Sequence, residues 1–133
     1  MPPSVNGKLP PTAREAAAFY LERGFVPVPV PRTGRCKAPV IDGWQHLRPG
    51  RDDLPGLFPD GEELNLGLLL GEPSGGLIDI DLDCPEAVAA APILLPPTGW
   101  VSGREGRPRS HWWYRAPPPL RYATEKFADL DAE

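Results

Sequence analysis

The sequence predicts an α+β fold in which helices pack on one face of a sheet. Two observations lead to this prediction. Small apolar residues near the N-terminus repeat with helical spacing, whereas five later segments have the apolar or alternating pattern of strands. Short turns rich in glycine and proline separate the segments, as is typical of a mixed fold with tight connections. The length of 133 residues, with 41% hydrophobic and 24% charged residues, suits one globular domain.

The first predicted element is a helix that begins after Thr12. Thr12 and Glu15 form a capping box, in which the hydroxyl accepts from the third helical N–H and the carboxylate reaches back. Gly24 has the position of a residue that ends a helix in the left-handed conformation. The face that packs is small and consists of Ala13, Ala16, Ala17, Tyr20 and Leu21.

The later elements follow from apolar runs and their breakers. Residues 25–30 predict a strand that alternating prolines confine to a sheet edge or a strand end. A loop at 32–43 and a polar stretch at 50–63 with one short helix come next. The remaining predictions are strands at 64–70 and 77–83, a tight turn at 71–76, a helix at 85–91 stopped by Pro92, and strands that begin at 99 and cover 111–116.

Composition excludes several classes of protein. No apolar run approaches the roughly 20 residues that span a bilayer, and the N-terminus has no apolar signal segment. Cys36 and Cys84 lie far apart, without metal-ligand spacing. We therefore expect a cytoplasmic protein with reduced thiols and no membrane partner. The net charge of −4 argues against a general polyanion binder.

The segment 77–83 contains an aspartate at every second position. Because successive side chains of a strand point to opposite faces, Asp79, Asp81 and Asp83 share one face, and the other face is apolar. Three like charges in a row repel one another unless a divalent cation lies between them, and carboxylate oxygens suit Mg²⁺ or Mn²⁺. The pattern predicts a metal site. The structural alternative is that Asp83 caps the helix at 85–91 and Asp79 is a solvated rim residue.

A basic and aromatic segment follows the acidic one. Between residues 99 and 122 there are five arginines and a single acid, Glu105. In the extended run 110–115, His111, Trp113 and Arg115 share a face, and an imidazole beside an arginine suits a triphosphate. Read alone, this segment is better explained by a structural role, in which His111 caps a strand and the tryptophans belong to the core. An acidic strand followed by a basic segment favours a metal-assisted phosphate site.

These pieces together resemble the N-terminal domain of bifunctional DNA primase–polymerases, the prim-pol branch of the archaeo-eukaryotic primase superfamily, which is common in phages, prophages and plasmids. The resemblance is carried by their order and spacing. The matching pieces are 16–24 (Ala-Ala-Ala-Phe-Tyr-Leu-Glu-Arg-Gly), 27–29, 37–39 leading to Gly43-Trp44, 65–67, 71–75, 78–83 and 109–111.

The resemblance implies a catalytic palm with an RNA-recognition-motif-like sheet packed by helices, which performs metal-dependent, template-directed nucleotidyl transfer. Its partners are a DNA template and primer, an NTP or dNTP and, in trans, a replicative helicase. It implies Mg²⁺ or Mn²⁺ on Asp81 and Asp83, with Asp79 as an auxiliary ligand. His111 matches the nucleotide-contacting histidine. Arg109, Arg115 and Lys37 are candidate nucleotide-binding residues.

The family pattern also has a third acidic position after the histidine strand, followed by a Gly-rich segment. Asp131 could be that carboxylate, but the Gly-rich strand is missing. We therefore expect a flexible segment at 1–11 and a C-terminally truncated prim-pol-like domain at 12–133. A non-catalytic remnant that binds nucleotide or DNA without turnover is the alternative function. An Asp-x-Asp phosphatase and a glycosyltransferase fit poorly, because Pro85 stands where the former needs Thr or Val and the latter needs a larger domain.

Overall fold

The computed structural model describes residues 12–32 and 38–117. The α+β prediction is confirmed: helices and antiparallel strands both occur in this part of the chain. The helices are α1 (Ala13–Glu22), α2 (Leu54–Leu57) and α3 (Pro85–Leu94), and the strands are β1 (Pro27–Pro31), β2 (Leu64–Leu68), β3 (Leu77–Asp81), β4 (Val101–Arg104) and β5 (Arg107–Arg115).

Helix α1 begins and ends as its sequence predicts. The Glu15 N–H donates to the Thr12 hydroxyl at 3.1 Å, and Gly24 has the positive φ of 84° that a glycine adopts without strain. The helix buries its small face, in which Ala17 is fully buried against Leu54 and Phe58. The Tyr20 ring is buried at the other end of this face.

Strands β1 and β2 form a two-stranded antiparallel sheet beside α1. Alternate residues of a strand direct their N–H groups to the same edge. The prolines at 27, 29 and 31 therefore share one edge, and Val28 and Val30 are left to pair with β2, where Gly67 and Asn65 are their partners. This is the edge strand that the prolines predict, beginning two residues later than expected.

The second sheet contains the acidic segment and has the strand order β3-β5-β4, antiparallel throughout. A turn from Gly71 to Gly76 leads into it from β2. The buried Ser74 hydroxyl in this turn accepts a hydrogen bond from the Val26 N–H at 2.9 Å. The turn thereby ties the second sheet to the start of β1.

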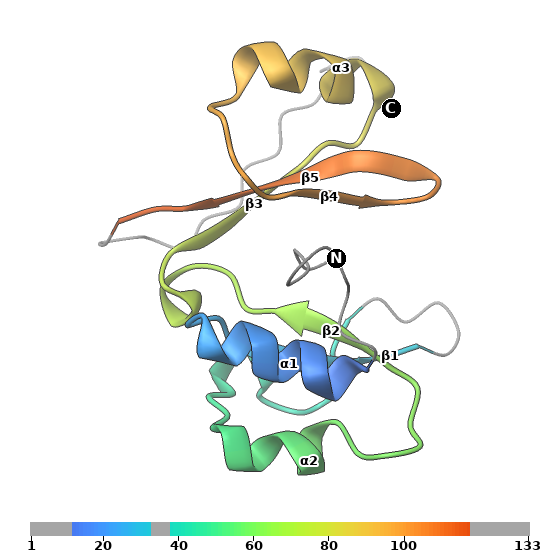
Figure 1. Ribbon diagram of the computed structural model, residues 1–133, viewed down its shortest axis with the longest axis vertical. Helices are drawn as coiled ribbons and strands as arrows, with labels where there is room; N and C mark the ends of the chain where they lie inside the picture. The colour runs from blue at the N-terminus through green and yellow to red at the C-terminus, as the bar shows by residue number, and fades with distance from the viewer. Residues whose placement is uncertain (1–11, 33–37, 118–133) are drawn as a thin grey trace.

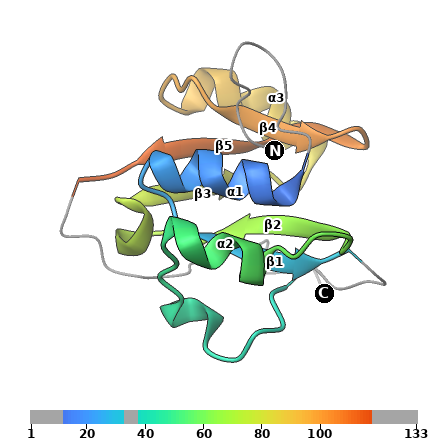
Figure 2. The same cartoon turned by 60° about the horizontal axis from the view of Figure 1, so that its bottom comes forward.

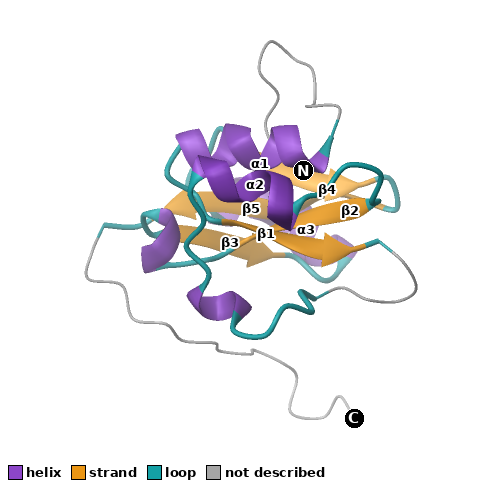
Figure 3. Cartoon of the chain, turned by 90° about the horizontal axis from the view of Figure 1, so that it is seen from below, coloured by secondary structure: helices purple, strands orange, loops and turns teal. Residues whose placement is uncertain are grey.

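Figure 1 shows how the layers are arranged. Helix α3 lies on one side of the three-stranded sheet, and α1, α2 and the β1–β2 pair lie on the other, an order that is also seen in Figure 2. Figure 3 shows α1 and α2 together on one side of the strands. The prediction that the helices pack on one face of the sheet is therefore wrong. Helix α3, which connects β3 to β4, lies on the opposite side of the three-stranded sheet from α1 and α2. No helix in the described part of the chain is long and apolar enough to span a bilayer.

Several boundaries differ from the prediction, and three of them affect the site or its neighbours. Helix α3 continues through Pro92 to Leu94. The proline removes only one N–H near the helix end, and the Leu95 N–H still donates to the Ala91 carbonyl at 2.9 Å. Strand β5 begins at Arg107 rather than 111, since β4 pairs with its basic start. Strand β3 ends at Asp81, two residues early.

Candidate active site

The site is built by the pairing of β3 with β5. Asp79 lies opposite Trp113, and Asp81 lies opposite His111. Directly opposed residues of an antiparallel pair project to the same face, so the two carboxylates and the imidazole share one face of the sheet. The register thus brings together three of the residues that the sequence singles out. Two of them, Asp79 and Asp81, are candidate metal ligands, and the third is the candidate nucleotide-binding histidine.

The imidazole of His111 lies between the two carboxylates. Its Nδ1 is 3.0 and 2.9 Å from the two carboxylate oxygens of Asp79, and its Nε2 is 3.8 Å from an Asp81 oxygen. An ionised carboxylate can only accept hydrogen bonds, so Nδ1 carries the proton and donates to Asp79. Nε2 is left without a hydrogen bond to Asp81 at this distance and is available to a ligand.

Asp79 and Asp81 have different surroundings although they are only two residues apart. The Asp79 side chain is 17% exposed and the Asp81 side chain is 56% exposed. Burial raises the pKa of Asp79, and the neighbouring His111 opposes that rise through its charge and its hydrogen bond. The Asp79 carboxylate is therefore hydrogen-bonded to His111, whereas the Asp81 carboxylate is exposed to solvent.

Aromatic rings lie beside the histidine on the same face, where the His111 ring stacks on Trp113 at 6.1 Å between ring centroids. The Trp113 ring stacks on Trp100 at 4.6 Å between ring centroids, and Trp100 in turn stacks on Tyr20 of α1 at 6.0 Å. The Trp113 indole N–H donates to the Ser102 hydroxyl at 2.8 Å, and Ser102 lies opposite His111 on β4. Ser102 is a neighbour of the site that the sequence does not single out, because only the strand register reveals it.

Asp83 lies beyond the end of β3, exposed, just before the helix N-cap Cys84. The Leu82 N–H still donates to the Ser110 carbonyl at 2.7 Å, so the chain leaves the sheet only after Leu82. Among the described residues, no group of three or more His, Cys, Asp or Glu side chains is arranged to hold a metal ion. The metal set of Asp79, Asp81, Asp83 and Asp131 stays a prediction, and Asp131 lies outside the described residues.

The arginines expected to bind the nucleotide lie away from His111. Arg109 has a positive φ of 59°, and its guanidinium lies 5.8 Å from the ring centre of Trp112, which projects to the opposite face of β5. Arg115 lies at the far end of β5, over the Phe25 ring at 4.9 Å, where it donates to the carbonyl of Arg23, the C-cap of α1. Their phosphate-binding role stays a prediction, and Lys37 lies outside the described residues.

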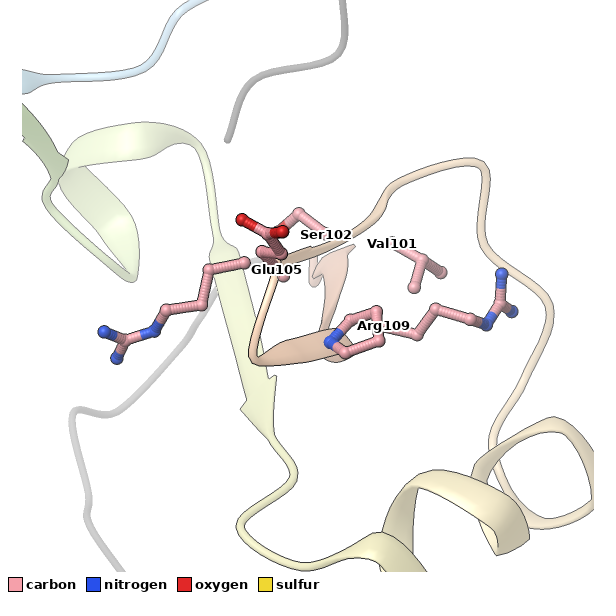
Figure 4. A pocket seen from close by; sticks show the side chains of 7 residues that line it. Val101, Ser102, Glu105 and Arg109 are labelled. Carbon is pink, nitrogen blue, oxygen red and sulfur yellow. The ribbon is translucent and has the colours of Figure 1, made fainter.

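The basic turn between β4 and β5 is a part of the site region that the sequence pattern did not predict. Arg104 and Arg107 are directly opposed there, and a hollow of about 440 Å³ is lined by residues 101–105, 108 and 109. Figure 4 shows these side chains, with Arg109 extending away from the carboxylate of Glu105. The sequence shows the high density of arginines in this segment, but the pairing of Arg104 with Arg107 depends on the strand register and could not be predicted from it.

A comparison with known protein families finds a match. The family model described as "Bifunctional DNA primase/polymerase, N-terminal" matches residues 17–132. The chain belongs to this family. No curated protein and no solved structure matches the chain.

The match to the primase/polymerase family confirms the resemblance on which the sequence interpretation rests. It covers β3 and β5 and thus includes the paired Asp81 and His111. The family is one of nucleotidyltransferases that act on DNA, and it is generally metal-dependent. This is the chemistry for which an exposed carboxylate beside an unoccupied imidazole nitrogen is suited.

Proposed function

We propose that the chain catalyses template-directed transfer of a nucleotide to a 3′-hydroxyl, as a primase/polymerase domain in phage, prophage or plasmid replication. The observation that carries the proposal is the pairing of Asp81 with His111 across β3 and β5, with the His111 Nε2 directed to the same side as the exposed carboxylate. Template and primer DNA and an NTP or dNTP are the substrates.

His111 contacts the incoming nucleotide through Nε2. In its doubly protonated form the ring donates from both nitrogens, so Nε2 donates to a phosphate oxygen while Nδ1 donates to Asp79. The charge on phosphate oxygens grows as the pyrophosphate leaves, and a fixed donor stabilises that charge. Asp79 holds the ring in the orientation that this contact needs, which makes it a positioning residue in our proposal.

Asp81 and Asp83 are the proposed ligands of Mg²⁺ or Mn²⁺. Both are exposed and offer hard oxygen donors near the end of β3, which fits such an ion, whereas Asp79 is occupied by the histidine. When bound, a divalent ion lowers the pKa of the attacking 3′-hydroxyl and offsets charge on the triphosphate. Asp131 is the proposed third acidic position.

The remaining parts of the proposal rest on the resemblance. Arg109, Arg115 and Lys37 are proposed to contribute positive charge toward the nucleotide, and a replicative helicase is the proposed partner in trans. The proposed location is the cytoplasm, where the DNA and the nucleotide pool are found.

Primer extension on a single-stranded template with Mn²⁺ and each nucleotide pool tests the proposal. We expect extension by the parent chain and none by the Asp81→Asn, Asp83→Asn double variant, with unchanged circular dichroism. An Asp52→Asn variant, which alters an exposed carboxylate outside the site, is the matched control and should retain activity. Nucleotide or DNA binding without any extension by the parent chain would instead support the non-catalytic alternative.

A further inference from the structure

The turn between β4 and β5 concentrates positive charge in a chain whose net charge is −4. Residues 104–109 contain three arginines and one acid, and all six residues are exposed. Within the described ranges, none of the three guanidinium groups forms an ion pair with a carboxylate. We call Arg104, Arg107 and Arg109 the hairpin arginines.

Two of these arginines are placed unfavourably for the isolated protein. Arg104 and Arg107 are directly opposed across β4 and β5, and like charges in such a pair destabilise a sheet. Arg104 lies two residues beyond Ser102 on β4, on the turn side of the register shift. An anion between the paired arginines would offset their repulsion.

The backbone of the hairpin is shaped to hold this arrangement. The register shifts between Ser102 and Arg104, and a Cβ at Gly103 would lie 2.3 Å from the Arg107 carbonyl oxygen. Arg109 has a φ of 59°, a conformation that costs a non-glycine residue free energy of order 1 kcal/mol or more. The Arg109 guanidinium lies over the Trp112 ring, and Figure 4 shows its side chain extending away from Glu105.

We propose that two of the hairpin arginines, Arg104 and Arg107, bind the phosphate backbone of the DNA strand that enters the site. This inference rests on the proposed function and names the surface that holds its nucleic-acid partner. A single triphosphate is compact and is usually enclosed, whereas Arg104 and Arg107 are exposed on an open turn. A continuous polyanion matches that distribution. β4 is also the edge strand of its sheet, so its outer backbone N–H groups are open to phosphate oxygens.

The distance along the sheet agrees with a strand that passes the site. Ser102 lies opposite His111 and Arg104 opposite Arg107, and the two β4 residues are two positions apart. At about 3.3 Å per residue the arginine pair lies roughly 7 Å farther along the sheet than His111. A backbone bound by the pair thus lies beside the proposed nucleotide site rather than within it.

Binding of a labelled single-stranded oligonucleotide to the full chain, in EDTA without nucleotide and over a salt series, tests this proposal. For single strands the logarithm of the affinity falls with the logarithm of salt concentration with a slope of about 0.7 per phosphate contact. The Arg104→Gln, Arg107→Gln double variant should therefore lose about 1.4 from the slope, which is about a 25-fold loss of affinity at 0.1 M salt. The Arg48→Gln, Arg51→Gln double variant removes the same charge elsewhere and should change affinity by less than about threefold.

Two outcomes would overturn the proposal. Equal slopes for the two double variants would show that the hairpin does not contact the backbone. Unchanged DNA affinity with a raised KM for the nucleotide would assign the arginines to the triphosphate. Because DNA binding is measured in EDTA, a slope change without primer extension would leave this inference standing while the proposed catalysis failed.

Discussion

Replacement of Asp79 by asparagine separates a positioning role from a ligand role for this carboxylate. Asparagine keeps the size and one acceptor oxygen but removes the charge that faces the His111 Nδ1 at 2.9 Å. A hydrogen bond to a charged group contributes about 1.5–3 kcal/mol. The His111 side chain is 35% exposed, so we take the lower end, about 1.5–2 kcal/mol. At about 1.4 kcal/mol per factor of ten, kcat for primer extension should fall roughly 10- to 30-fold.

Two further measurements make the result specific to the histidine. Mn²⁺ affinity should stay within about twofold of the parent, because Asp79 is not a ligand in our proposal. The ¹⁵N shifts of the His111 ring should change, because its Nδ1–H partner is altered. His46 is the other histidine of the chain and is exposed, so its unchanged shifts provide an internal reference.

Two outcomes would refute the reasoning. A kcat within twofold of the parent, in a folded variant, would mean that the imidazole does not depend on Asp79 for its orientation. A complete loss of extension together with lost Mn²⁺ binding is the result expected for Asp81→Asn. The same result for Asp79→Asn would show that Asp79 is a metal ligand rather than a positioning residue. The two results differ in Mn²⁺ binding and cannot be confused.

Three predictions concern stability, measured by urea denaturation. Gly76→Ala should destabilise the chain by about 2 kcal/mol or more, because a Cβ would clash with the Ala116 carbonyl oxygen and φ is +90°. Gly99→Ala is the control: a Cβ there would meet open space, so stability should change by less than about 0.5 kcal/mol. Ser74→Ala should cost about 1–3 kcal/mol, because the buried Val26 N–H loses its acceptor; a cost below 0.5 kcal/mol would contradict the assigned hydrogen bond. Burial raises the pKa of Asp79 in the folded state, so the folded state binds that proton more tightly and stability falls as pH rises from about 4 through the raised pKa. Asp79→Asn removes this decline, so its stability relative to the parent should increase with pH across that window, and a constant difference would count against the shift.

The alternation of β3 was readable from the sequence because it depends only on the two-residue period of a strand. Asp79 and Asp81 share a face, as predicted, and Ile78 and Ile80 lie half-buried on the other. The same period holds for His111 and Trp113 on β5. Local periodicity was thus sufficient to group the site residues of each strand.

The partners across strands could not be predicted in the same way. That Asp79, rather than solvent or a cation, meets the His111 Nδ1 depends on the register between β3 and β5. The register depends on contacts between residues 32 positions apart in the chain. Arg109 shows the limit of the strand period: counting by twos from His111 places it on the active face, but the bulge at its positive φ turns it to the Trp112 side.

The two sheets share no backbone ladder in the described part of the chain, so we expect the two parts of the molecule to open independently. Contacts between the parts are few and made largely by side chains, such as the Ser74 hydroxyl on the Val26 N–H and the Tyr20 ring on Trp100. Amide hydrogens of β5, which pairs with a strand on each side, should therefore exchange more slowly than those of Val28 and Val30 on β1, which pairs with β2 alone. Loss of the N-terminal half by local opening would leave the β3–β5 pairing of Asp81 and His111 in place.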